Sequence, residues 1–361
     1  MGRYKNYSEF LSEALNYVNL DTIKNDQITL GQLDTTKDSN KITQIKNILI
    51  PDLKGPIGNF LDDKKIPKSN IPVILNLMEK HFIGNDNDLL NWLANPSKNE
   101  FKLNPTNGGH IPLAEIENHF AHLFDKKFFE KLIELSGLGL PVVGRTELYY
   151  CMLSHFSNST TGGDIKGPNN ELIEVKQRRG RLGGTKNTKN WSKSESEIQK
   201  AFKPHGVSWK SKTKSFGPGA LLDLAKTFSD TIQKLDINQT KLLTKKLIVA
   251  LSNYTASNEL LSKTTVNYIS TVFINEANSS KASNKLKAII TAIHLDGYYR
   301  EERFDWLFTT TNDRKHLCTL NCKDSNFEQI HKFTSTYFNN QIEWGDAAQT
   351  RVGASIGDIK I

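Results

Sequence analysis

Gly163-Asp164-Ile165 and Ile173-Glu174-Val175-Lys176 are the two stretches of this sequence that decide its fold and its chemistry. Alternate side chains of a β-strand point to the same face, so Glu174 and Lys176 share one face of the second stretch. The apolar residues of that stretch point the other way, into a core. The turn sequence Gly167-Pro168-Asn169-Asn170 predicts a hairpin that brings the aspartate of the first stretch back beside the second.

Two carboxylates and an ammonium group on a rigid hairpin can bind a hard cation and orient a water molecule. Mg²⁺ prefers oxygen ligands and bridges carboxylates to phosphate, and a bound metal lowers the pKa of water. A bare Glu-x-Lys triplet is common on exposed strands, where it is only a solvated face. The spaced Asp164, the turn, and Glu147 at the start of an upstream helix favour a metal site over that simpler interpretation.

These residues resemble the PD-(D/E)XK nuclease superfamily, which includes restriction enzymes, Holliday-junction resolvases and phage nucleases. The resemblance rests on Gly144-Arg145-Thr146-Glu147, on Asp164 and on Glu174-Val175-Lys176. It covers about 45 residues, a length at which motif matches are hypotheses to be tested by structure. In that family a helix carrying a glutamate precedes the strands, and Glu147 opens such a helix here. Gly163 departs from the pattern, because the family usually has a proline before the aspartate.

The resemblance implies an α/β (α+β) fold with a restriction-endonuclease-like mixed-sheet core flanked by helices. The core of the family continues after the hairpin with a helix and a further strand. Two pairs fit these elements, 221–235 with 247–251 or 286–293 with 304–309. We favour the second pair, because its strand carries aromatic and threonine residues typical of sheets. Residues 247–251 are interpreted as a buried strand or as a helix continuing from Lys241.

Three segments are expected along the chain. They are a helical N-terminal region at 1–110, the nuclease-like core at 111–310 and a C-terminal extension at 311–361. Within the core, apolar residues at helical spacing predict one helix from about 113 to 135. Residues 178–218 are basic, rich in Gly and Ser and poor in aliphatic residues, which predicts a long functional loop or an insertion into the core.

The resemblance also implies a role for each residue of the site. Asp164 and Glu174 would be direct ligands of Mg²⁺, for which Mn²⁺ would substitute, and the carbonyl of Val175 would be a further ligand. Lys176 would orient the attacking water and offset developing negative charge. Glu147 would join from the helix, as a ligand of a second ion or through a water.

A basic segment follows the metal-binding strand directly. From Lys176 to Lys214 the chain has twelve Lys or Arg residues and two acids, while the net charge of the whole chain is +8. Guanidinium groups bind phosphate oxygens, glycines allow close approach, and aromatic rings stack on unpaired bases. Alternatively, the segment is a solvated loop whose aromatic residues pack against the core. Gln177 would contact the phosphate or the attacking water, and the residues expected to bind nucleic acid are Arg178, Arg179, Arg181, Lys186, Lys189, Trp191 and Lys193.

The predicted function is that of a magnesium-dependent endonuclease that hydrolyses DNA phosphodiester bonds, of restriction, resolvase or phage DNA-processing type. The alternative is a non-catalytic DNA-binding or virion structural protein on a nuclease-like fold. The expected partner is duplex or branched DNA, with RNA as a further alternative, and a homodimer follows by analogy only. No nucleotide cofactor is expected, because Gly137-x-Gly139 lacks both a third glycine and a preceding strand.

The sparse, odd set of cysteines predicts a reducing, cytoplasmic location, or a virion if the protein is phage-encoded. No apolar run has the length needed to span a bilayer, and the N-terminus lacks a signal-peptide pattern. No membrane partner is therefore expected. His316, Cys318 and Cys322 are spaced like part of a zinc site but lack a fourth ligand nearby.

Overall fold

The computed structural model describes most of the chain from residue 56 onward. Two compact units divide the chain: residues 1–104 with 112–175 form the first, and residues 105–111 with 176–361 form the second. The predicted core at 111–310 contributes residues to both units. The residues that the structure describes are 56–67, 70–106, 109–134, 146–159, 162–176, 181–182, 191–210, 218–252, 263–276, 282–311, 313–337, 342–344 and 354–356.

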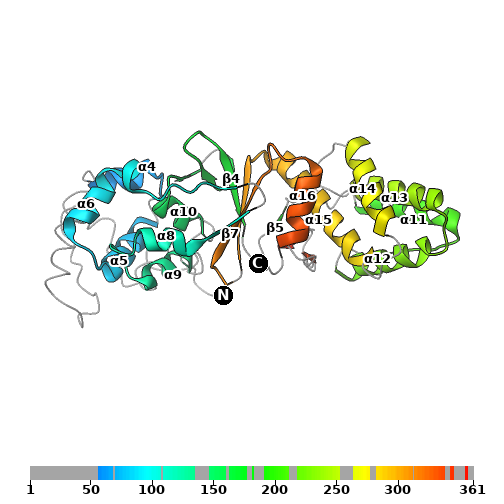
Figure 1. The fold of residues 1–361 in the computed structure, drawn as a ribbon, viewed down its shortest axis with the longest axis horizontal. Coiled ribbons are helices and arrows are strands. Elements are labelled where there is room, and N and C mark those ends of the chain that lie inside the picture. The colour runs from blue at the N-terminus through cyan, green and yellow to red at the C-terminus, as the bar shows by residue number, and fades with distance from the viewer. Residues whose placement is uncertain are drawn as a thin grey trace, which may run out of the picture. The chain divides into compact units, whose positions relative to one another are not determined.

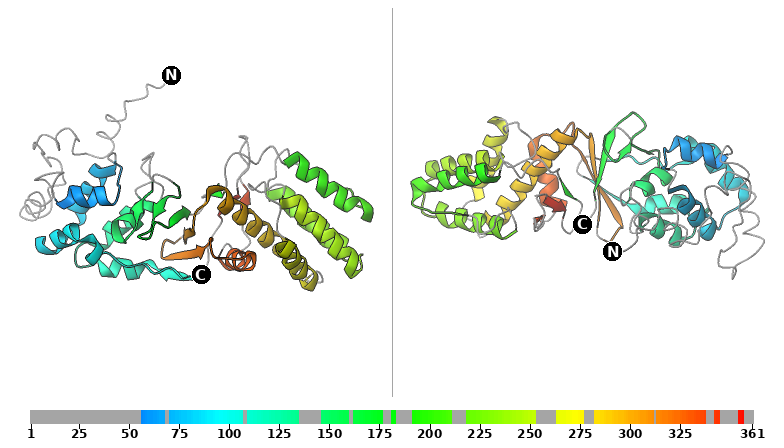
Figure 2. Two further views of the ribbon diagram at one scale, coloured as in Figure 1. Left: turned by 90° about the horizontal axis from the view of Figure 1, so that it is seen from above. Right: turned by 180° about the vertical axis from the view of Figure 1, so that it is seen from behind.

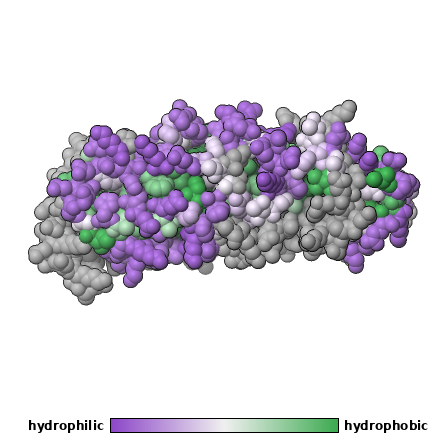
Figure 3. Space-filling view, viewed as in Figure 1, coloured by the Kyte–Doolittle hydropathy of each residue, from purple (hydrophilic) through white to green (hydrophobic). Residues whose placement is uncertain are grey.

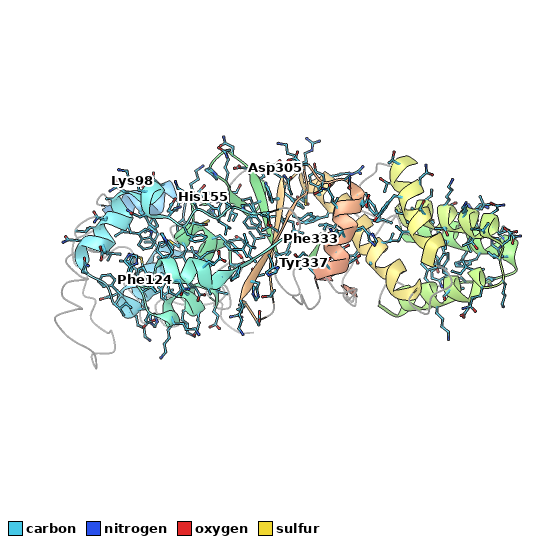
Figure 4. The ribbon with its side chains drawn as sticks, viewed as in Figure 1. Lys98, Phe124, His155, Asp305, Phe333 and Tyr337 are labelled. Atoms are coloured by element: carbon cyan, nitrogen blue, oxygen red, sulfur yellow. The ribbon has the colours of Figure 1, made fainter. Side chains whose placement is uncertain are left out.

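Helices form most of the first unit (Figure 1). Aromatic side chains fill its core, where the ring of Trp92 lies 5.1 Å from that of Phe60 and 5.6 Å from that of Phe124. Phe124, labelled in Figure 4, also stacks on Phe128 at 3.9 Å. The helices are α4 (Pro56–Asp63), α5 (Ile71–His81), α6 (Asp86–Ala94), α7 (Pro96–Asn99), α8 (Leu113–His119), α9 (Lys126–Glu134) and α10 (Glu147–Leu153).

The segment predicted as one helix from about 113 to 135 forms two helices, α8 and α9. The carbonyl of Leu123 accepts the backbone N–H groups of Ile83 and Gly84, so this part of the chain pairs with the segment after α5. The carboxylate of Asp125 then accepts the N–H of Phe128 at 3.1 Å, as an N-cap residue does. The prediction of a single helix is wrong. The apolar residues keep helical spacing across the boundary, but Asp125 caps a new helix there.

A buried lysine holds the C-terminal end of α10. Lys64 is 4 % exposed, and its ammonium group donates hydrogen bonds to the carbonyl oxygens of Ser154 at 2.7 Å and Phe156 at 3.1 Å. It also pairs with the buried carboxylate of Glu100. The last carbonyls of a helix lack intrahelical donors and carry partial negative charge. Lys64 therefore satisfies this end of α10, which carries Glu147 at its other end.

The described strands pair in the order β2-β3-β4 in the first unit and β1-β7-β6 in the second. Within the first unit, β2, β3 and β4 form an antiparallel meander. Within the second unit, β6 and β7 form an antiparallel pair. The fold is therefore mixed α and β, as the sequence predicts. The strands are β1 (His110–Pro112), β2 (Ser157–Asn158), β3 (Ile165–Lys166), β4 (Leu172–Lys176), β6 (Trp306–Thr310) and β7 (His316–Asn321).

The second unit is built around longer helices, which Figure 2 shows from two further sides. Helix α13 includes residues 247–251, so the strand considered for this segment is wrong and the alternative, a helix continuing through Lys241, is correct. None of the helices in the described residues is long and apolar enough to cross a membrane. The helices are α11 (Trp191–Phe202), α12 (Pro218–Ile232), α13 (Ile237–Ser252), α14 (Lys263–Glu276), α15 (Ala282–Glu302) and α16 (Phe327–Tyr337), with the 3-10 turn η4 (Lys203–His205).

Helix α11 lies inside the segment predicted as a long loop or an insertion. Its Ile198, Ala201 and Phe202 are buried, and Trp209 just beyond the helix is 3 % exposed. Three apolar positions at helical spacing are therefore enough to hold a helix within a basic, polar stretch. For Phe202 and Trp209, the alternative interpretation of aromatic side chains that pack into a core is confirmed.

Of the two predicted downstream helix–strand pairs, 221–235 with 247–251 and 286–293 with 304–309, the second is a helix followed by a strand. Helix α15 covers residues 286–293, and β6 follows it in the chain as predicted for 304–309. Helix α16 then packs beside α15 and β7. Phe333 and Tyr337, labelled in Figure 4, lie one turn apart on α16 with their ring centroids 5.0 Å apart. The C-terminal extension also contains strands, β8 (Ile342–Trp344) and β9 (Ala354–Ile356), which form a second sheet with β5 (Arg181–Leu182).

Replacing Lys64 with methionine is expected to destabilise the protein by about 3–5 kcal/mol at pH 8, because the buried carboxylate of Glu100 loses its partner. Burial raises the pKa of Glu100 and Lys64 lowers it, so the variant's Glu100 binds a proton more readily. The loss should therefore shrink as the pH falls toward 5. Urea unfolding of Lys64→Met measures this. The exposed Lys131→Met, whose pair with Glu134 lies on the surface, is the control and should lose well under about 1 kcal/mol.

Candidate metal site

A hairpin of β3 and β4 forms the centre of the candidate site. Ile165 pairs with Ile173 and Lys166 with Leu172, in antiparallel register. The turn closes with a hydrogen bond from the N–H of Gly167 to the carbonyl of Glu171 at 2.8 Å. The predicted hairpin is thus confirmed, and it places the residue before β3 next to the middle of β4.

Asp164 is fixed against β4 by its backbone and by its side chain. Its N–H donates to the carbonyl of Ile173 at 2.8 Å, and its own carbonyl accepts the N–H of Ser159 at 3.1 Å. Its carboxylate oxygen Oδ2 accepts the N–H of Val175 at 2.8 Å. Val175 is the residue between Glu174 and Lys176 in the chain. The carboxylate of Asp164 is therefore held at the predicted Glu-x-Lys triplet.

Gly163 makes this close approach possible. Its φ is +62°, in the left-handed region, and a Cβ atom there would lie 3.0 Å from both the backbone nitrogen and the oxygen of Ile173. Proline fixes φ near −65°, so the proline usual in the similar family cannot adopt this backbone conformation. The departure from the family pattern thus matches the local geometry of this chain.

Glu174 and Lys176 differ in their surroundings although they share one face of β4. Glu174 is 6 % exposed, whereas Lys176 is partly exposed. The Nζ atom of Lys176 lies 5.7 Å from the centre of the ring of Tyr298, a buried residue of α15. This distance is within the range of a cation–π interaction. No sequence motif marks Tyr298, because this tyrosine lies on a helix distant in sequence from the hairpin.

Glu147 lies in the first turn of α10 and is 8 % exposed. Thr146 before it has φ of +74°, an outlier for a β-branched residue that costs about 1–3 kcal/mol. One turn further along α10, burial raises the pKa of the Cys151 thiol well above its usual range, and the Glu147 carboxylate raises it further. Cys151 is thus a protonated core residue, and Glu147 is a buried acid that follows a residue with a strained backbone.

Within the described part of the chain, no group of three or more His, Cys, Asp or Glu side chains is arranged to hold a metal ion. Glu147 therefore does not join Asp164 and Glu174 as a third ligand in this structure, and its role stays a prediction. Asp164, Glu174 and the Val175 carbonyl carry oxygen atoms, the ligand type of Mg²⁺, which is commonly held by one or two carboxylates, waters and substrate phosphates. His316, Cys318 and Cys322 do not form such a group either.

The residues predicted to bind nucleic acid are only partly described. Arg181 lies in β5, which pairs with β9. Trp191 and Lys193 lie in the first turn of α11. The remaining predicted residues fall outside the described parts of the chain, and these are Gln177, Arg178, Arg179, Lys186 and Lys189.

Comparison with known proteins adds no relative to this description. No protein-family model, no curated protein and no solved structure matches this chain. The resemblance to PD-(D/E)XK nucleases therefore depends on the motif residues and on the geometry of the hairpin.

Changing Gly163 to alanine should destabilise the protein by about 2–4 kcal/mol, since it adds a backbone clash to the cost of positive φ. Gly206→Ala is the matched control, because its φ is +70° and a Cβ atom there meets nothing within 4 Å. Gly206→Ala should cost only about 1 kcal/mol. Urea unfolding of both variants measures the difference, and equal losses would contradict the tight approach of Gly163 to Ile173.

Proposed function

We propose that this protein is a magnesium-dependent endonuclease that hydrolyses DNA phosphodiester bonds. The observation that carries the proposal is the hydrogen bond from the N–H of Val175 to the carboxylate of Asp164. It joins the lone aspartate to the Glu-x-Lys strand through the backbone, so that the two acids are positioned by one hairpin. A solvated strand face would not need this connection.

The order of the elements gives a second line of support. Apart from the short strand β2, the structure has along the chain a helix with a glutamate in its first turn (α10), a strand hairpin (β3 and β4), and later a helix followed by a strand (α15 and β6). This is the order that the PD-(D/E)XK family predicts. The helices α11 to α14 are then an insertion between the hairpin and the last helix–strand pair.

Each residue of the hairpin has a chemical task in the proposed reaction. Asp164, Glu174 and the carbonyl of Val175 would hold Mg²⁺, with Mn²⁺ as a substitute. The bound ion would lower the pKa of a water and neutralise charge on the phosphate. The hydrogen bond from Val175 keeps one carboxylate oxygen of Asp164 occupied, which leaves the other oxygen as the ligand atom. Burial of Glu174 removes competing water and strengthens its interaction with a cation.

Lys176 would orient the attacking water and offset the negative charge that develops on the phosphate. An ammonium group on a flexible four-carbon chain does this well only if it is held in place. The ring of Tyr298, 5.7 Å from Nζ, supplies such a contact. We therefore assign Lys176 to charge stabilisation and water orientation, with Tyr298 as the residue that positions it.

The alternative is a non-catalytic DNA-binding or virion structural protein that uses the same fold. The lack of a three-ligand metal group among the described residues favours it. Measurements of metal binding and of DNA cleavage distinguish the two proposals. A protein that binds DNA but neither binds Mn²⁺ nor cuts DNA with it would support the alternative.

The variants Asp164→Asn, Glu174→Gln and Lys176→Met should each reduce Mg²⁺-dependent cleavage of supercoiled DNA by at least about 100-fold, because each removes a ligand or the stabilising charge. Circular dichroism of each variant shows whether its fold is retained. Glu115→Gln and Lys131→Met, which change exposed residues of α8 and α9, are the controls and should cut DNA like the wild type. Full activity in the folded Glu174→Gln and Lys176→Met variants would refute the assigned roles.

A further inference from the structure

Helix α13 carries an exposed face of lysines that the proposed reaction does not use. The α13 lysine face consists of Lys241, Leu242, Lys245, Lys246 and Val249. All three lysines are exposed, and Leu242 and Val249 are 52 % and 44 % exposed. Figure 3 shows apolar side chains among hydrophilic ones over the helices α11 and α13.

The opposite face of α13 fixes the helix in the second unit. Its Leu243, Leu247 and Ile248 are buried, and α13 packs against both α11 and α14. The helix begins at a clear N-cap, where the carboxylate of Asp236 accepts the N–H groups of Asn238 and Gln239 at 2.8 and 2.9 Å. The lysines are thus presented by a rigid helix, and the nearest acid in sequence is already used as a cap.

No lysine of this face forms an ion pair with a residue that the structure describes. Some exposed lysines elsewhere in the described parts do have such partners, as in the pairs Lys131–Glu134 and Lys200–Glu197. Helix α13 itself has no acidic residue. Glu197, an acid of α11, the helix packed beside α13, is thus already paired with Lys200. The positive charge of the face is therefore not neutralised by the described part of the protein.

This arrangement has a cost that a surface without function would avoid. Lys241 and Lys245 are separated by one helical turn, about 6 Å of axial rise. Like charges at this spacing destabilise a helix by about 0.2–0.5 kcal/mol, and a glutamate at either position would reverse the sign. A polyanion bound along the helix would turn this repulsion into attraction.

We propose that the α13 lysine face binds the phosphate backbone of DNA. The inference rests on the proposed function, since it names a surface of the second unit that grips the DNA substrate of the hairpin site. Lysines neutralise phosphates without reading the base sequence, and each contact releases a counterion. The exposed methyl groups of Leu242 and Val249 lie between the lysines. They make this face less polar than a fully solvated lysine surface.

A protein partner is the competing occupant of the same face. Three lysines without an ion pair to any described residue, on a helix without acids, favour a polyanion over an apolar groove, because burial of uncompensated ammonium groups in a protein interface is costly. Charge complementarity therefore commits the proposal to nucleic acid. Self-association through Leu242 and Val249 is left as an outcome of the test.

The test compares two triple variants that remove the same charge. Lys241→Gln/Lys245→Gln/Lys246→Gln changes the α13 face, and Lys126→Gln/Lys127→Gln/Lys131→Gln changes three exposed lysines of α9, a helix that also carries two glutamates. Glutamine has nearly the helix propensity of lysine, so both variants should fold. Binding to a 30-base-pair duplex is measured by fluorescence anisotropy in EDTA, from 50 to 300 mM salt, so that no cleavage occurs.

The α13 variant should raise Kd at least about 10-fold at 100 mM salt and reduce the slope of log K against log salt by about 2.7, or 0.9 for each phosphate contact. The α9 variant should keep the wild-type slope. Equal slopes in all three proteins would overturn the inference, as would a change only in sedimentation, which would identify the face as a self-association surface. If the wild type binds through α13 but does not cut with Mg²⁺, the inference stands and the proposed nuclease activity fails.

Discussion

The hydrogen bond between the N–H of Val175 and the carboxylate of Asp164 is the interaction on which the candidate site depends. It requires the hairpin of β3 and β4 in its observed register and a backbone at residue 163 that only glycine adopts easily. Elsewhere in the first unit, buried Lys64 fixes the end of α10 through Ser154 and Phe156. The local geometry of the hairpin therefore places the carboxylate of Asp164 beside the strand that carries Glu174 and Lys176.

The hairpin could be predicted from sequence because its signals are local. Alternating apolar and charged residues mark β4, and the Gly-Pro-Asn-Asn turn sets its pairing with β3. The choice of α15 and β6 as the later helix–strand pair also followed from the aromatic and threonine residues of that strand. Where the spacing of apolar residues and the residues of the turn both indicate the same short element, the prediction agrees with the structure.

Other features depend on contacts that no local pattern contains. The break between α8 and α9 is set by Asp125 and by pairing of Leu123 with the segment after α5. Helix α11 gives a weak apolar signal within a basic stretch, where Ile198, Ala201 and Phe202 are the buried positions among its described side chains. The ring of Tyr298 near Lys176 comes from a helix more than a hundred residues away in the chain. The place of Glu147 relative to the two hairpin acids is likewise a matter of tertiary packing, and spacing alone cannot supply it.

The central claim is that Asp164 and Glu174 hold one divalent cation together. A crystal structure of the protein soaked with Mn²⁺, with anomalous diffraction recorded at the manganese edge, tests this directly. The expected result is an anomalous peak within about 2.2 Å of a carboxylate oxygen of each residue. A peak bound to other residues, or no peak at saturating Mn²⁺, would contradict it.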